Sequence, residues 1–325
     1  MAAEARMDFP VHVVEFSPFV PTAELLAIGG DTKVLVARVD TDPTEIVPLL
    51  DLHHDTRITA IGWSPVTPRS EESLAPSVVF CTAGSDFKLR VFTAALEDQT
   101  SEMVELRGHT DIVNAVSFDT RTGATLASTG DDHTVRLWDT TAAVQLACMQ
   151  LDSPGTAIRW LPEPADEVGG PARPPPLEFQ RLMVAGRRGH IRMFYAAPHR
   201  QVAGETLRAG RAPLLDADFT NIVADSIEGE IGAVADGRVV RWRVPSAGVP
   251  KSSKKSPFLE AASCFRFGSV RPLFHAVGGV DGYQVFDDND VCLLQQRGHC
   301  TSMTWHALQN TCCFAVGSSV QIYIG

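Results

Sequence analysis

Four side chains with reactive or hydrogen-bonding groups occur close together in the middle of the sequence: His109, Ser128, Asp132 and Trp138. A histidine near a serine and an aspartate has the composition of a hydrolytic triad, but such triads are defined by geometry and not by residue type. The same groups can instead form one chain of hydrogen bonds inside a sheet. Since an unpaired buried polar group costs about 1–3 kcal/mol, the members are useful only together. We therefore predict a structural network, with Thr129 as the alternative hydroxyl.

The segment that must position these groups runs from residue 107 to residue 140. It begins with a Gly-His pair at 108–109 and continues with two strand-like runs on either side of a tight Asp-Asp-His turn at 131–133. It ends in a Trp-Asp pair at 138–139. This order of a Gly-His loop, three short strands and a closing Trp-Asp pair is typical of a WD-repeat blade.

The rest of the chain divides into similar units in which most of the signature is lost. Short alternating apolar runs between Gly and Asp turns indicate β-strands, and no convincing helical period occurs outside the loops. Seven units of about 40–45 residues account for the 325 residues as one closed domain. We predict an all-β, seven-bladed WD-repeat β-propeller over residues 1–325, closed by an N-terminal strand. The approximate blades are 11–50, 51–100, 104–150, 151–205, 212–258, 260–295, and 297–325 together with 1–10.

The position of Trp138 is predicted to hold a bulky apolar side chain in the other units, where the core needs volume. The expected equivalents are Val36, Phe92, Phe194, Trp242, Phe286 and Tyr323. Two insertions, Val66–Ser77 and Glu163–Glu178, are rich in Pro, Glu and small residues and are predicted to be surface loops.

The seventh unit ends after its third strand, at Gly325. An open sheet edge there would expose unpaired N–H and C=O groups. Residues around Ala5–Phe9 are predicted to supply the missing outer strand, so that deletion of residues 1–9 lowers the melting temperature.

Bulk properties narrow the function classes. A net charge of −11 argues against direct nucleic-acid binding. The first ten residues lack the apolar segment of a secretory signal, and no stretch approaches the roughly 20 apolar residues of a membrane span. The seven cysteines are an odd, scattered set, which favours reduced core residues over a disulfide framework.

Other motifs have simpler explanations than catalysis or metal binding. Residues 85–88 match Ser-X-X-Lys without its partner motifs, and residues 287–290 lack the glycine and distal Glu of a calcium loop, so both are predicted to be turns. The Cys and His residues from 299 to 313 contain no Cys-X-X-Cys pair, which disfavours a zinc site. We predict no cofactor, no metal and no catalytic residue.

A second Gly-His pair occurs at 298–299, and His299 is predicted to repeat the role of His109, with the hydroxyl of Tyr323 in place of the indole. The only basic run, Lys251–Lys255, is predicted to be a solvated connection between the fifth and sixth blades. The alternative is a contact for an acidic partner, or a contact switched by phosphorylation.

Five stretches of this sequence resemble the family of small WD-repeat nucleoporins of thirty-seven kilodaltons, densely through the first 160 residues. They are Val11–Phe19, His53–Pro65, Gly108–Asp119, Asp131–Asp139 and Ser153–Trp160. The Pro-rich insertion of the fourth unit and the 251–255 run depart from the family's pattern.

The resemblance implies a non-catalytic scaffold subunit of the Y-shaped complex in the outer rings of the nuclear pore. It implies docking of the propeller onto a large nucleoporin with its own propeller and α-solenoid, a role in nucleocytoplasmic transport, and association with kinetochores in mitosis. No nucleic acid, membrane insertion or small-molecule substrate is expected, and the partner-binding residues are unknown.

Two alternatives remain open. The first is a different adaptor, such as a substrate receptor for ubiquitin ligases or a histone-tail reader. The second is a propeller enzyme with convergent titratable groups at the channel mouth, for which the sequence offers only the isolated Asp216 and Asp218.

Overall fold

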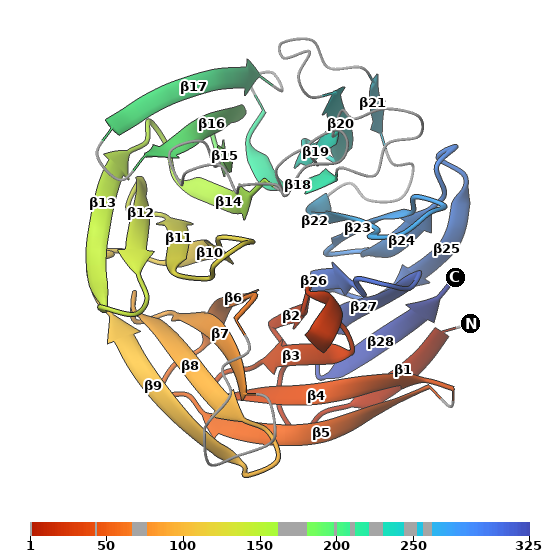
Figure 1. Ribbon diagram of the computed structural model, residues 1–325. Helices are drawn as coiled ribbons and strands as arrows, with labels where there is room; N and C mark the ends of the chain where they lie inside the picture. The colour runs from red at the N-terminus through yellow and green to blue at the C-terminus, as the bar shows by residue number, and fades with distance from the viewer. Residues whose placement is uncertain are drawn as a thin grey trace, which may run out of the picture.

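The computed structural model describes residues 2–42, 44–66, 77–161, 181–197, 200–208, 212–220, 230–243, 252–255 and 262–325. Seven four-stranded antiparallel sheets are arranged radially, like the blades of a propeller (Figure 1). The predicted all-β, seven-bladed propeller is confirmed. The insertion at 163–178, and all but the two ends of the insertion at 66–77, lie outside the described residues.

The strands of each sheet follow one another from the centre to the rim. The first sheet contains β2 (Val13–Phe16), β3 (Leu25–Gly29), β4 (Lys33–Thr41) and β5 (Thr44–His53), and the second contains β6 (Ile58–Trp63), β7 (Ser77–Gly84), β8 (Leu89–Ala95) and β9 (Thr100–Leu106). The third sheet contains β10 (Val113–Phe118), β11 (Thr125–Gly130), β12 (Thr134–Asp139) and β13 (Val144–Gln150). The fourth contains β14 (Gly155–Trp160), β15 (Arg181–Gly186), β16 (His190–Ala197) and β17 (Arg200–Arg208). The last three contain β18 (Leu214–Thr220), β19 (Glu230–Ala235), β20 (Arg238–Arg243) and β21 (Ser252–Lys255); β22 (Ala262–Phe267), β23 (His275–Gly279), β24 (Gly282–Phe286) and β25 (Cys292–Arg297); β26 (Cys300–Trp305), β27 (Thr311–Val316), β28 (Ser319–Ile324) and β1 (Ala2–Arg6).

Helical structure is nearly absent from these residues. The described part of the chain has one helical segment, the short 3-10 turn η1 (Val20–Thr22). It contains no helix of the length and apolarity needed to cross a membrane.

The seventh sheet is closed by the other end of the chain. Strand β1 pairs with β28 in the register Ala2↔Tyr323 to Arg6↔Ser319, and the backbone N–H of Met7 then donates to Ser318 O at 2.8 Å. The closure is as predicted, but the strand lies nearer the terminus than Ala5–Phe9. The remainder of that segment packs instead, since Phe9 joins the apolar cluster between the seventh and first blades.

The core consists of seven apolar clusters, one at each junction between neighbouring blades. Both faces of every sheet are therefore covered, which explains why second strands such as β3, β11 and β27 are buried along nearly their whole length. Because the ring of junctions is continuous, no blade can tilt without disturbing its two neighbours. The result is a rigid disc.

Two details of the sequence interpretation are wrong. In the first blade the residue in register with Trp138 is Ala37 and not Val36, because Leu26 pairs with Ala37 as Leu126 pairs with Trp138. A slip of one residue moves a side chain to the other face of the sheet. In addition, the lysine-rich run is not a connection: Ser252–Lys255 forms β21, the outer strand of the fifth sheet. An outer strand needs backbone pairing but no apolar alternation, so its sequence pattern is weak.

The two short motifs at 85–88 and 287–290 are confirmed as turns. Residues 85–87 form the turn between β7 and β8. Asp287 Oδ1 accepts the backbone N–H groups of Asn289 and Val291, at 3.0 Å and 2.7 Å, in the turn between β24 and β25.

Candidate functional site

The structure brings the four predicted residues of the third blade together. The ring of His109 lies between Asp132 and Ser128: Nδ1 is 2.7 Å from Asp132 Oδ2, and Nε2 is 2.7 Å from Ser128 Oγ. The indole N–H of Trp138 donates to the same Ser128 Oγ at 2.8 Å. Thr129 uses its hydroxyl elsewhere, since it donates to the carbonyl of Thr134 at 2.9 Å. The hydroxyl of the network is therefore that of Ser128.

The proton positions in this network follow from its ends. A carboxylate only accepts, so His109 Nδ1 donates to Asp132, and the neutral ring accepts at Nε2 from the Ser128 hydroxyl. Burial lowers the pKa of His109 against the opposing effect of Asp132, which keeps the ring neutral near pH 7. Burial alone would raise the pKa of Asp132, but hydrogen bonds from Thr134 and His109 lower it overall.

Nothing in this chain of hydrogen bonds is available to a substrate. Ser128 is completely buried between neighbouring blades, and its oxygen is engaged by both the indole and the imidazole. Gly108, before the histidine, is tightly enclosed, since a Cβ there would lie 2.6 Å from Arg136 Nη1 and 3.0 Å from the Trp138 ring. The arrangement holds the loop before β10 against strands β11 and β12.

The second blade contains a related network that sequence reasoning missed. His54 Nδ1 donates to the carbonyl of Thr56 at 2.6 Å, and Nε2 lies 3.0 Å from the hydroxyl of Thr82, which is in register with Ser128. Asp86, in the turn equivalent to that of Asp132, instead binds the buried Arg90 at 2.7 Å and 3.1 Å. Burial alone would raise the pKa of Asp86, but Arg90 lowers it to about 2.

The seventh blade does not form the network expected of it. His299 is exposed at the surface, and among the described residues no hydrogen bond joins it to Tyr323. The reason is that Phe314 stands in register with Ser128, and the turn at 317–318 has no aspartate. Tyr323 packs edge-on against Trp305 instead, with ring centroids 6.4 Å apart. The prediction for His299 and Tyr323 was wrong.

The Cys and His residues between 299 and 313 do not converge either. His306 is buried beside Phe16, with ring centroids 5.2 Å apart, while Cys312 and Cys313 are buried at 0% exposure in β27. Across the described part of the chain, no group of three or more His, Cys, Asp or Glu side chains is placed to hold a metal ion.

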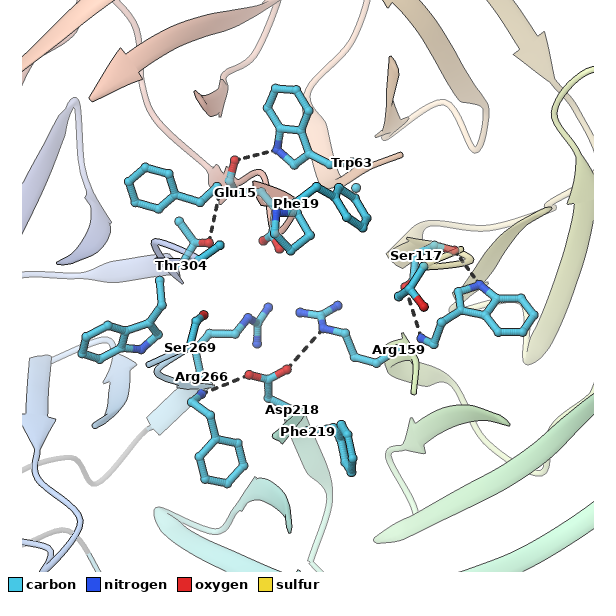
Figure 2. A pocket seen from close by; sticks show the side chains of 18 of the residues that line it. Glu15, Phe19, Trp63, Ser117, Arg159, Asp218, Phe219, Arg266, Ser269 and Thr304 are labelled. Atoms are coloured by element: carbon cyan, nitrogen blue, oxygen red, sulfur yellow. Dashed lines mark hydrogen bonds and ion pairs between the residues drawn. The ribbon is translucent and has the colours of Figure 1, made fainter. Parts of the chain in front are cut away.

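A second group of polar residues lines the centre of the ring (Figure 2). Each inner strand contributes one residue that directly precedes an aromatic residue and lines the same cavity of about 360 Å³. In blade order these seven residues, which we call the channel ring, are Glu15, Gly62, Ser117, Arg159, Asp218, Arg266 and Thr304. A second cavity, of about 520 Å³, lies at the other mouth. It shares Glu15, Ile61, Val116, Arg159 and Arg266 with the first, so the two cavities meet in the channel.

Two aspartates of β18 connect the fifth blade to the sixth. Asp216 Oδ2 accepts the backbone N–H of Phe265 and Asp218 Oδ2 that of Phe267, each at 3.0 Å. Asp216 also forms a very short ion pair with Arg266, and Asp218 Oδ1 lies 3.4 Å from Arg159 Nε. These four residues, which sequence reasoning did not bring together, are thus mutually neutralised.

Other junctions make the same backbone contact with neutral side chains. Thr304 Oγ1 accepts the N–H of Phe16 at 3.0 Å, and Ser117 Oγ that of Trp160 at 3.3 Å. Ser117, Asp218 and Thr304 hold equivalent positions, so the same hydrogen bond between neighbouring inner strands recurs around the ring. The carboxylate of Asp218 accepts it where the other two blades use a hydroxyl. This is a positional role.

Glu15 differs from the other acids of the channel. No hydrogen bond from a described residue reaches its carboxyl group, and burial raises its pKa even though Arg159 and Arg266 act to lower it. Burial also opposes the charge of Arg266, but Asp216, Asp218 and Glu15 raise the pKa of that guanidinium overall. The channel therefore holds two guanidinium groups, two paired carboxylates and one unpaired carboxyl group.

The channel ring had a sequence signal that was overlooked. Side chains alternate between the faces of a strand, so the residue before each inner-strand aromatic must point away from the blade junction. The pairs Glu15-Phe16, Arg159-Trp160 and Arg266-Phe267 follow this rule. What alternation does not give is which of these residues face one another across the ring.

Comparisons with known proteins agree with this architecture. The family model described as WD domain, G-beta repeat matches residues 100–139, which covers the outer strand of the second blade and three strands of the third. The chain is 32% identical over 281 residues to nucleoporin Nup37 of Homo sapiens, which covers 84% of this chain and 78% of the relative. It is 31% identical to nucleoporin Nup37 of Mus musculus over the same shares, and 29% identical over 199 residues to that of Drosophila melanogaster, covering 61% of this chain and 54% of the relative. A WD-repeat propeller whose sequence matches these relatives along most of its length belongs to the Nup37 family of nucleoporins.

Proposed function

We propose that this chain is a non-catalytic scaffold subunit of the outer ring of the nuclear pore complex. The observation that carries the proposal is the match to the Nup37 nucleoporins over 84% of the chain. A disc with seven covered junctions suits a scaffold, because its strands stay fixed while its loops and rim are free to bind. Localisation at the nuclear envelope and support of nucleocytoplasmic transport follow from that placement.

The partner that we propose is a large nucleoporin with its own propeller and α-solenoid, in the Y-shaped complex. The same complex would bring the chain to kinetochores in mitosis. A stable scaffold contact needs roughly 800 Å² on each side. The rim offers exposed apolar side chains for it on two outer strands, Met103 and Val104 on β9 and Val144 and Leu146 on β13, which are 41–49% exposed.

The absence of catalysis is part of the proposal. Its support is that the one triad-like set, around Ser128, is buried and internally satisfied. The two acids named as a possible enzyme site, Asp216 and Asp218, are engaged by backbone N–H groups and by arginines.

Affinity purification followed by mass spectrometry tests this function. A tagged chain should recover scaffold nucleoporins, and a variant with Val104→Glu and Leu146→Glu should recover them less well. The matched control is Val280→Glu, at an exposed apolar residue of the turn between β23 and β24. Recovery of ubiquitin-ligase subunits or histones in place of nucleoporins would favour a different adaptor.

A further inference from the structure

The unpaired carboxyl group of Glu15 lies next to an uncharged part of the channel. Its neighbours in the channel ring are Thr304 on one side and Gly62 on the other, and Ser117 follows Gly62. The positively charged members, Arg159 and Arg266, come from the opposite blades and point toward one another across the cavity (Figure 2). An entering group can therefore approach Glu15 along Gly62 and Ser117.

The adjoining cavity of about 520 Å³ extends along that side. Ala60 and Ala115 line it beside these two blades, together with the larger Ile61 and Val116. Phe19 lines the first cavity near the same blades and offers an aromatic face to an aliphatic stem or a cation.

The charges favour a cation. Asp216 and Asp218 neutralise Arg266 and Arg159, so an ionised Glu15 gives the channel one uncompensated negative charge. Further charged or titratable groups, Arg57, His12 and His299, line only the far mouth. The whole chain has a net charge of −11, which attracts basic segments of other proteins.

We propose that the channel binds a lysine or arginine side chain of a protein partner, which enters past Phe19 and pairs with Glu15. Such a contact gives the half-buried Glu15 carboxyl group, which no described residue hydrogen-bonds, a charge-assisted hydrogen bond. The site does not depend on placement in the nuclear pore, since it uses only residues of this chain.

The test uses NMR titration of the full chain with the peptide acetyl-Gly-Ser-Lys-Ser-Gly-amide. Saturable shifts are expected at the backbone amides of Gly62 and Ser117. The same peptide with acetyl-lysine should give none, and the arginine peptide and n-butylammonium show which cation is preferred and whether a free amine suffices. Absence of saturable shifts with every cationic probe would overturn the proposal.

Substitution of Glu15 tests whether this residue contacts the cation. Glu15→Gln should weaken binding about tenfold, the scale of one lost charge-assisted hydrogen bond. Glu102→Gln, at an exposed residue of β9, is the matched control and should bind as the unmodified chain does. Equal affinity of the Glu15→Gln variant would contradict the assignment.

A pH series on the unmodified chain needs no variant. A cation binds the ionised carboxylate, so affinity should rise with pH as Glu15 ionises above its ordinary pKa range and then level off. An affinity that is constant from pH 5 to pH 8 would count against the proposal. If the purification recovers no nucleoporins, the proposed scaffold function fails, while the peptide titrations still test the channel site.

Discussion

The third and seventh blades begin with the same Gly-His pair and use it in opposite ways. In the third blade His109 is buried and bonded at both ring nitrogens, whereas in the seventh His299 is exposed. The difference lies in the residues that would receive the ring: Ser128 in one blade and Phe314 in the other. The buried histidines of the second and third blades, His54 and His109, each meet a hydroxyl at this register position, Thr82 or Ser128, which the seventh blade lacks.

The seventh blade replaces the polar network by contacts with its neighbours. Phe314 stacks on Tyr283 of the sixth blade, with ring centroids 3.9 Å apart, and the Tyr283 hydroxyl donates to Gln321. The third blade thus adds an internal polar network to its two packed junctions, whereas the seventh has aromatic and apolar contacts with its neighbours in place of that network. Variants of the two blades should therefore lose stability by different amounts.

Deletion of residues 1–9 should destabilise the seventh blade most strongly. It removes β1 and the apolar side chains of Met7 and Phe9, which pack against the cluster of the seventh and first blades. We expect the free energy of unfolding to fall by about 3–5 kcal/mol, the scale for losing a large packed apolar side chain. Urea unfolding measures the change. A synthetic peptide of residues 1–9 should restore part of the stability, and an unchanged unfolding curve would exclude closure by β1.

Ser128→Ala should be costly, whereas His299→Ala should not. The first leaves the indole N–H of Trp138 and the Nε2 of His109 without their partner in a buried site, which costs about 2–3 kcal/mol. The second changes an exposed side chain and should stay within about 0.5 kcal/mol. Thermal and urea unfolding of both variants provide the comparison. Similar losses in the two variants would mean that the blades do not differ as described.

Acid should weaken the fold through its buried histidines. Burial lowers the pKa of His109 in the third blade and of His306 in the seventh. Below about pH 6.5 the unfolded chain binds protons that the folded chain does not, so the free energy of unfolding falls as the pH drops. The expected loss between pH 6.5 and 5.5 is at most about 1 kcal/mol per histidine, the limit set by protonation of the unfolded chain alone. His109→Gln should flatten this dependence; an unchanged slope would show that His109 protonates equally in both states.

Tyr283→Phe measures what the hydrogen bond between Tyr283 and Gln321 contributes to stability. The change removes the hydrogen bond to Gln321 and keeps the ring that stacks on Phe314. We expect a loss of about 0.5–1.5 kcal/mol, the net value of one hydrogen bond. Tyr283→Leu removes the stack as well and should cost clearly more. Equal losses would assign the whole contribution to the hydroxyl.

Local pattern predicted much of the fold, because each strand is specified by alternation and each turn by its own residues. The set of His109, Ser128, Asp132 and Trp138 was accessible because it lies within one repeat. Glu15 and Arg266 were not: they are far apart in sequence and meet only through ring closure. The error at His299 has the same origin, since the decisive residue, Phe314, is defined by strand register and not by the Gly-His pair.

The joining of the ring also determines how the molecule responds to force. Both ends of the chain lie at the same side of the seventh blade (Figure 1), with Ala2 opposite Tyr323 at one end of the pairing between β1 and β28. Tension applied to these two residues would separate β1 from β28 one backbone hydrogen bond at a time, starting at this end of the pairing. The other six sheets would carry none of this load until the first strand had peeled away.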